Sequence, residues 1–332
     1  MNRINVGIVA DPASPTEIAR RMSDLDSPAG EDRGAWDVEV VSEPFTTGSE
    51  DVDDAMARLR EQGRRQEWDL VIGVTELPLR DDDGRYLLVE TDPQQRTAVL
   101  SLPALGGLRM HARTRHAVRA LISGMSDPTS KKEHRVPLTR LGGRWRLLLG
   151  MVLANRPWLL VPGLKSALVA ALATGAIATV NSTVWLLAGS LSGWRLVVAS
   201  IASVVLVVAW LVIDGELWDR PEDDSDGAKE RSRLYNTSTL LTLTTGVIIC
   251  YLALYVVNLL WALFILDPAV MGGYLHASVG YGDLFALTWF VASAATVGGA
   301  LGTGLESDEA IRAAAYSKRE EERRDRLAHE RT

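Results

Sequence analysis

The chain has 332 residues and a formal net charge of −7, and 47% of its residues are hydrophobic. Its acidic balance argues against a nucleic-acid partner, because phosphate binding requires a concentrated basic face that this sequence lacks. A single cysteine, Cys250, excludes an intrachain disulfide and a thiol-rich metal site. The N-terminus lacks the basic and then apolar layout of a signal peptide, so we do not expect the N-terminal domain to be exported by that route.

Residues 1–128 are charged and punctuated by turns, and we expect them to fold as a cytosolic α/β domain. Apolar runs of strand length alternate with helical segments, which predicts a sheet that is mainly parallel at its start. The strands are expected at residues 4–10, 38–41, 70–74, 86–90 and 97–102. The helices are expected from about Ser14, at residues 49–65 and at residues 113–123.

Polar side chains follow three of these strands and form the candidate ligand-binding site of the head. They are Asp11, Glu43, Thr75 and Glu76. Ligands of parallel sheets bind at the carboxyl ends of the strands, so acids there could hold a cationic ligand or a metal. Acids in such loops are also common turn formers and helix caps. A phosphate-binding glycine loop is missing from the sequence, which removes the simplest nucleotide site and leaves any cofactor unknown.

Part of the head resembles archaemetzincin-type peptidases. The resemblance rests on Gly-Val-Thr-Glu-Leu at residues 73–77 and Ala-Val-Leu-Ser-Leu at residues 98–102, followed by a helix. Those enzymes carry a His-Glu-x-x-His zinc motif in that helix. Here the comparable residues 116–120 read His-Ala-Val-Arg-Ala, so the base and the second zinc ligand are both missing. The resemblance therefore implies at most a degenerate or metal-dependent hydrolase head.

Residues 129–157 are expected to form a basic linker and an interfacial helix. The segment 144–157 is apolar in its middle and cationic at both ends, and it is too short to span a bilayer. We expect it to lie along the inner leaflet and to turn into the membrane at Pro157 and Pro162. An ordinary connector is the alternative.

Residues 158–305 are expected to form an all-α four-helix transmembrane domain. Four apolar runs are near or above the roughly 18 residues that a hydrocarbon core requires. They cover residues 161–184, 196–213, 240–265 and 284–305. Lys and Arg concentrate before the first run, between the second and third, and after the fourth, whereas the opposite side has only Arg195. This bias predicts a multi-pass inner-membrane protein with both termini in the cytoplasm, and the tryptophans at alternating span ends agree.

The connection before the last span resembles a potassium-channel filter. It reads Ser278, Val279, Gly280, Tyr281, Gly282 and Asp283. Such a string can replace the hydration shell of an ion with backbone carbonyls when four chains contribute it. Only about a dozen residues separate it from the third span, which leaves little room for a pore helix. The alternative is a glycine-rich outer turn in which Asp283 caps the fourth helix.

The spans carry polar but uncharged residues near their centres. These are Asn181, Thr242, Thr244, Thr245 and Asn258, which typically bond across helices. No charged residue lies near a predicted midplane, which argues against an ion-coupled transporter. Gly298 and Gly302 form a small-x-x-x-small pair, which allows close helix packing within one chain or in a homo-oligomer. Residues 306–332 are expected to form a polar cytosolic helix.

The chain as a whole is similar to an uncharacterised membrane-protein family of actinobacteria. The matching segments are residues 7–12, 41–44, 101–106, 298–302 and 306–308. The resemblance implies an α/β head followed by about four spans, and it implies no activity. The sequence shows no catalytic constellation and no metal-ligand spacing. We therefore expect a head that binds a cytosolic protein or a small molecule, with a channel or a hydrolase as the alternatives.

Overall fold

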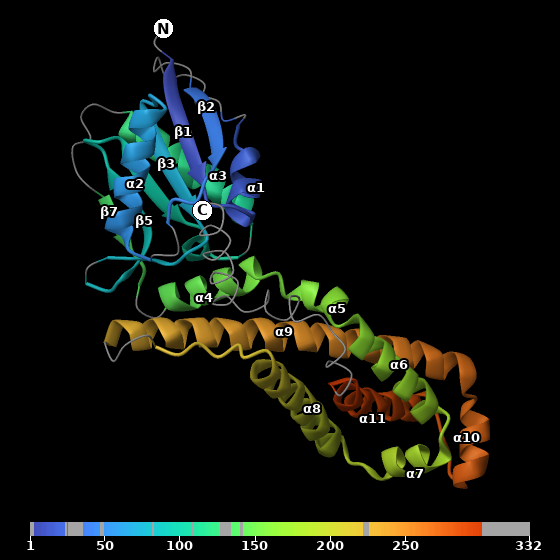
Figure 1. The fold of residues 1–332 in the computed structure, drawn as a ribbon. Helices are drawn as coiled ribbons and strands as arrows, with labels where there is room; N and C mark the ends of the chain where they lie inside the picture. The colour runs from blue at the N-terminus through green and yellow to red at the C-terminus, as the bar shows by residue number, and fades with distance from the viewer. Residues whose placement is uncertain are drawn as a thin grey trace. The chain divides into compact units, whose positions relative to one another are not determined.

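The computed structural model of the chain describes residues 3–23, 25, 36–46, 50–81, 83–107, 109–126, 134–139, 142–221 and 226–300 (Figure 1). These residues fall into two compact units, one ending at Ala154 and one beginning at Asn155. The first unit is an α/β domain, here called the head. The described residues of the second unit form helices and the connections between them. The predicted division into an α/β part and an α-helical part is confirmed at this level.

The head is built on one mixed sheet. Its strands are β1 (Ile4–Ala10), β2 (Trp36–Ser42), β3 (Leu70–Thr75), β4 (Leu79–Arg80), β5 (Tyr86–Asp92), β6 (Thr97–Ser101) and β7 (His134–Pro137). They lie in the order β2-β1-β3-β6-β5-β4, and β7 pairs with β5. The first four strands of this order are parallel, and β5 is antiparallel to β4, β6 and β7. The sheet is therefore parallel at its start, as the sequence predicts.

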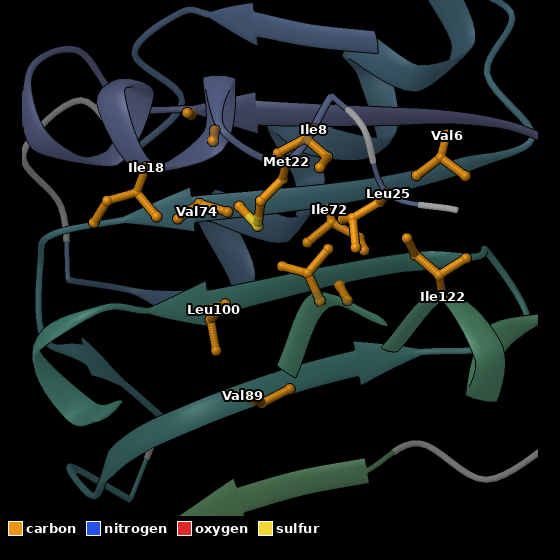
Figure 2. Packing of buried hydrophobic residues seen from close by; sticks show 14 of the residues in the cluster. Val6, Ile8, Ile18, Met22, Leu25, Ile72, Val74, Val89, Leu100 and Ile122 are labelled. Carbon is orange, nitrogen blue, oxygen red and sulfur yellow. The ribbon is translucent and has the colours of Figure 1, made fainter. Parts of the chain in front are cut away.

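Helices cover both faces of this sheet. On one face, α1 (Ser14–Arg20) and α3 (Met110–Met125) pack on the even-numbered side chains of β1 and β3, such as Ile8 and Ile72 (Figure 2). On the other face, α2 (Val52–Arg65) packs on odd-numbered side chains such as Val71 and Val99. Strands buried on both faces carry near-continuous apolar runs, which is why their sequence gave a clear signal.

Strand β7 lies in the segment that the sequence assigns to the linker. Its Arg135 donates from Nε to Oε2 of Glu90 at 2.7 Å, and Glu90 is only 6% exposed. A buried carboxylate without a partner would be costly, so Arg135 ties this segment to the sheet. The hydrogen bond with Glu90 also raises the pKa of Arg135. The sheet of the head therefore extends beyond the predicted boundary at residue 128.

The predicted interfacial helix is α4 (Gly142–Ala154), and it groups with the head. It packs against the 3-10 helix η1 (Pro103–Leu105), and Gly150 lies so close that a Cβ there would be 2.1 Å from the carbonyl oxygen of Pro103. Only glycine permits this approach of two backbones. Trp145 and Leu149 of the same helix remain exposed, so α4 combines a docked face with an apolar exposed face.

The second unit consists of helices. They are η2 (Pro157–Leu159), α5 (Leu160–Gly163), α6 (Lys165–Thr179), α7 (Ser182–Ser190), α8 (Gly193–Asp214), α9 (Asp226–Ile265), α10 (Pro268–Leu275) and α11 (Tyr281–Ala300). Among the described residues, two helices are long and apolar enough to cross a membrane, α8 and the part of α9 from Ala228 to Ile265. A bent pair that ends at Thr179 would raise the number to three.

The first predicted span, residues 161–184, is divided in the structure. Helix α5 ends at Gly163, a weak helix former, and the helices on the two sides of this break are bent by 55°. The chain breaks again after Thr179, where the side chain of Asn181 caps α7 by accepting from the N–H of Thr183 at 2.9 Å. Helix α6 alone is about 22 Å long at 1.5 Å per residue, less than the roughly 30 Å of a hydrocarbon core.

Candidate functional site

The sheet has a topological switch point at β1. This strand lies between β2 and β3, so the chain passes from β1 to β2 on one side and then crosses to β3 on the other side. In open α/β sheets the crevice outside the carboxyl ends of such strands is the usual ligand site. The N–H of Asp11, just after β1, donates to the carbonyl of Val74 in β3 at 3.0 Å. The carboxyl ends of β1 and β3 thus lie side by side, as the site prediction requires.

Asp11 is fully buried and holds the connection between β2 and α2. Its Oδ1 accepts from the N–H of Phe45 at 3.2 Å, and its Oδ2 accepts from the hydroxyl of Thr46 at 2.8 Å. Both oxygens are therefore engaged inside the head. A ligand would have to break these bonds to reach the carboxylate, so the structure gives Asp11 an organising role at this edge.

The exposed part of the edge comes from the end of β2. Ser42 and Glu43 are both exposed. The hydroxyl of Ser42 lies 2.7 Å from that of Thr16, which in turn donates to the carbonyl of Asp11 at 2.9 Å. The Nε2 of Gln62 donates to Glu43 at 2.5 Å. Ser42 and Glu43 are thus held in fixed positions while they face solvent.

Thr75 and Glu76 form the turn after β3. Thr75 is fully buried, and its hydroxyl accepts from the N–H of Leu77 at 3.0 Å. Ser101 at the end of β6 donates to the carbonyl of Leu77 at 2.8 Å, which fixes the same turn. Glu76 is only 4% exposed. Of the predicted site residues, Glu43 is accessible, whereas Asp11, Thr75 and Glu76 lie behind the surface.

The structure gives no metal site at this edge. Across the residues described, no three His, Cys, Asp or Glu side chains are grouped so that they could hold a metal ion. His116, which occupies the position of the first zinc ligand in the peptidase resemblance, is exposed on α3.

A cavity of about 410 Å³ lies at the opposite edge of the sheet, which the sequence did not point to. Its walls include Arg60, Arg64, Trp68 and Arg96. Arg60 also forms an ion pair with Asp92 at 3.3 Å. Arg60 and Arg64 are one helical turn apart on α2. Arginines toward the end of a helix also compensate the helix dipole, so the sequence alone does not mark these two as part of a site. Glu67 and Asp69 line the same cavity, and Arg64 pairs with Glu61 at 3.0 Å. This arginine cavity is therefore a second candidate site whose walls carry both cationic and anionic groups.

The filter-like string begins a helix in the structure. Tyr281, Gly282 and Asp283 form the first turn of α11, and Oδ2 of Asp283 accepts from the N–H of Gly280 at 2.8 Å. A residue in the first turn that bonds back to the N-cap amide is half of a capping box. A carbonyl filter requires extended backbone with its oxygens in a row. The observed geometry favours a turn in which Asp283 caps the helix, the alternative that the sequence offered.

The helical unit contains a hydrogen-bond network between α8, α9 and α11. The hydroxyl of Tyr251 lies 2.9 Å from that of Ser200 and 3.0 Å from that of Ser293. The indole of Trp289 donates to Ser200 at 2.6 Å. No pattern in the sequence indicates this network, because its members lie on three separate helices and none is unusual alone.

The polar residues that the sequence did single out in the spans have mostly local bonds. The amide of Asn258 donates to the carbonyl of Leu254 at 2.8 Å, and its side chain lies against Gly175, where a Cβ would be 2.3 Å from Oδ1. Thr242 accepts from Asn155 at 3.2 Å. Thr245 donates to the carbonyl of Leu241 at 2.7 Å. Only some of these residues therefore connect separate elements.

The small-residue face of α11 packs within the chain. A Cβ at Gly299 would lie 2.8 Å from the carbonyl oxygen of Ala167 in α6 and 2.9 Å from the Cβ of Ala171. The nearest atom to a Cβ at Gly298 would be Cγ2 of Thr174 in α6, at 3.8 Å. Gly302 and the predicted helix 306–332 lie outside the described residues. The close approach to α6 is thus made by Gly299, a neighbour of the predicted pair, and the role of Gly298 and Gly302 in packing stays a prediction.

Comparison with known protein families, with curated proteins and with solved structures finds no match to this chain.

Proposed function

We propose that this chain is an inner-membrane protein whose cytosolic head binds a small polar ligand or a protein partner at the carboxyl edge of its sheet. The proposal depends on one observation: Ser42 and Glu43 are exposed at the switch point while hydrogen bonds from Thr16 and Gln62 hold them in place. A fixed, solvent-facing polar edge lowers the entropy cost of binding. Binding at this edge requires no catalytic group.

The chemistry of the edge suggests a ligand with hydrogen-bond donors or positive charge. Glu43 presents a carboxylate and Ser42 a hydroxyl, and the buried carboxylates of Asp11 and Glu76 lie in the loops behind them. Charge-assisted hydrogen bonds to a carboxylate are roughly twice as strong as neutral ones. An anionic ligand would instead fit the arginine cavity at the other edge.

Variants at the two edges test this proposal. The full-length protein in detergent is screened by thermal shift against cationic, neutral and anionic metabolites. A ligand that uses the carboxyl edge should lose about 2 kcal/mol of binding free energy with Glu43→Gln, because one charge-assisted bond is lost. Arg96→Gln in the arginine cavity is the matched control and should leave that affinity unchanged.

The opposite pattern would overturn the assignment of the site. Selective binding of anions that is lost with Arg96→Gln and kept with Glu43→Gln would move the site to the arginine cavity. Metal-dependent hydrolysis that is lost with Glu76→Gln would replace the binding function by an enzymatic one.

We further propose four spans with both termini in the cytoplasm. The arrangement is supported by α8 and α9, by the bias of Lys and Arg toward alternate connections, and by α11, whose described part has 20 residues. The two helices α6 and α7 would together make the first crossing, broken at Asn181.

Reporter fusions test this topology. Fusions after Ser225 and Arg326 should report the cytoplasm, and fusions after Gly189 and Gly273 should report the outside, because charged connections stay on the cytoplasmic side. Enzymatic reporters active on only one side of the membrane measure this directly. A cytoplasmic signal after Gly273 would contradict the charge argument and leave only α8 and α9 as candidate spans.

A further inference from the structure

A cavity of about 450 Å³ lies between α8 and α9 in the helical unit. Branched apolar side chains line it, among them Val204, Val208 and Val212 of α8. Leu240 of α9 and Trp218 of the connection between the two helices also contribute. Its size is within the range of sites for small organic ligands, and its walls are almost entirely apolar. Because both helices are long and apolar enough to cross a membrane, this groove is available to a lipid acyl chain.

The connection after α8 shows which end of the groove lies next to polar residues. Leu217 belongs to the same apolar cluster as Leu243 of α9. Two residues later, Asp219 lies beside Asn236, which precedes Leu243 on α9. There the N–H of Asp219 donates to Oδ1 of Asn236 at 2.8 Å, and Nδ2 of Asn236 donates to the carbonyl of Asp219 at 2.9 Å. Trp218 lines the groove and directly precedes Asp219, the residue that pairs with Asn236.

Two arginines lie beyond that contact. Arg220 follows Asp219 directly, and Arg233 precedes Asn236 by one helical turn. Both are exposed. Seven residues separate Arg233 from Leu240, a spacing that puts both on one face of α9 and separates them by about 10 Å. An amphipathic indole followed by two cations at the end of an apolar groove is the arrangement expected at a membrane interface.

We propose that the groove between α8 and α9 binds an anionic phospholipid, with an acyl chain along the valines and the headgroup phosphate at Arg220 and Arg233. The two arginines select this lipid, because arginine pairs with phosphate oxygens, and the cytoplasmic leaflet, which this connection faces in the topology proposed above, is rich in anionic lipids. Asp214, Glu216 and Asp219 lie in the same connection, and Glu222, Asp223 and Asp224 follow Arg220 in the sequence. The site therefore depends on the two arginine side chains themselves and not on a net positive charge of the connection.

The test uses the full-length protein in detergent and native mass spectrometry with phosphatidylglycerol and phosphatidylcholine of identical chains. The wild-type protein should retain phosphatidylglycerol more strongly. The double variant Arg220→Gln and Arg233→Gln should weaken that retention roughly thirtyfold, since each of the two basic residues contributes about 1 kcal/mol near an anionic headgroup. Arg195→Gln at the far end of α8 is the matched control and should behave as wild type.

A second variant tests the acyl-chain part of the site. Ala209 lines the groove and is exposed, so Ala209→Trp fills it without entering the helix packing. This variant should lose phosphatidylglycerol although both arginines remain. The proposal is overturned if the wild-type protein retains the two lipids equally, which means ordinary annular lipid. It is also overturned if the double variant and Ala209→Trp both retain phosphatidylglycerol as the wild type does.

Discussion

Replacing Asp11 by alanine should destabilise the head by about 3 kcal/mol, because the change leaves the hydroxyl of Thr46 and the N–H of Phe45 without their buried acceptor. Thr46 and Phe45 are each only 2% exposed, so water cannot easily replace the lost carboxylate. The loss should be concentrated at the carboxyl edge. Hydrogen exchange of the amides of β1 in the full-length protein measures it as a lower free energy of opening.

The conservative variant separates the hydrogen bonds from the volume of the side chain. Asp11→Asn keeps one oxygen acceptor and the shape, so it should lose about half as much stability. Asp51, which caps α2 at an exposed position, is the matched control. Asp51→Ala should cost about 1 kcal/mol, the usual value of an N-cap. An Asp11→Ala variant within about 0.5 kcal/mol of the wild type would remove Asp11 from the organisation of the edge.

Replacing Gly150 by leucine should detach α4 from η1. Even the Cβ of the new side chain would lie 2.1 Å from the carbonyl oxygen of Pro103, a backbone atom that cannot rotate away. Overpacking of this kind typically costs about 1–3 kcal/mol, and we expect the upper end here because two backbones must separate. Hydrogen exchange of the α4 amides should rise sharply, while that of β1 and β3 should change little.

Gly124 of α3 provides the control for this substitution. A Cβ there has no neighbour within 4 Å, so Gly124→Ala should stabilise its helix by about 0.5–1 kcal/mol. Unchanged exchange of α4 in Gly150→Leu would show that the docking of this helix contributes little. In that case the exposed Trp145 and Leu149 would become its main functional feature, as expected for a helix that lies on the membrane.

The central elements of the head could be predicted because local patterns agree with the fold there. The expected strand at residues 70–74 is β3 (Leu70–Thr75), and the expected helix at residues 49–65 is α2 (Val52–Arg65), capped by Asp51. Continuous apolar runs mark strands buried on both faces, and acids before a helix with arginines at its end mark its direction. The two-residue strand β4 and the edge strand β7 gave no such signal.

The candidate site could be predicted from the sequence only in part. The order of the strands predicts that polar residues gather at one edge, and the structure brings Asp11 and the turn of Thr75 together there. Which of them faces solvent depends on hydrogen bonds between residues more than 30 positions apart, such as that of Asp11 with Thr46. The arginine cavity was missed for the same reason, since Arg96 meets α2 only in the folded sheet.

The sequence by itself determined the chemical division of this protein into a charged α/β head and an apolar helical part, because hydrophobic periodicity and length are local properties of the chain. The tertiary structure alone decided that β7 and α4 group with the head, that Asp11 is an internal partner of the loop after β2, and that residues 281–283 begin a helix. It also decided that Ser200, Tyr251 and Ser293 meet between three helices. Each of these outcomes depends on close contacts and hydrogen bonds between distant segments, whose energies exist only once the chain is folded.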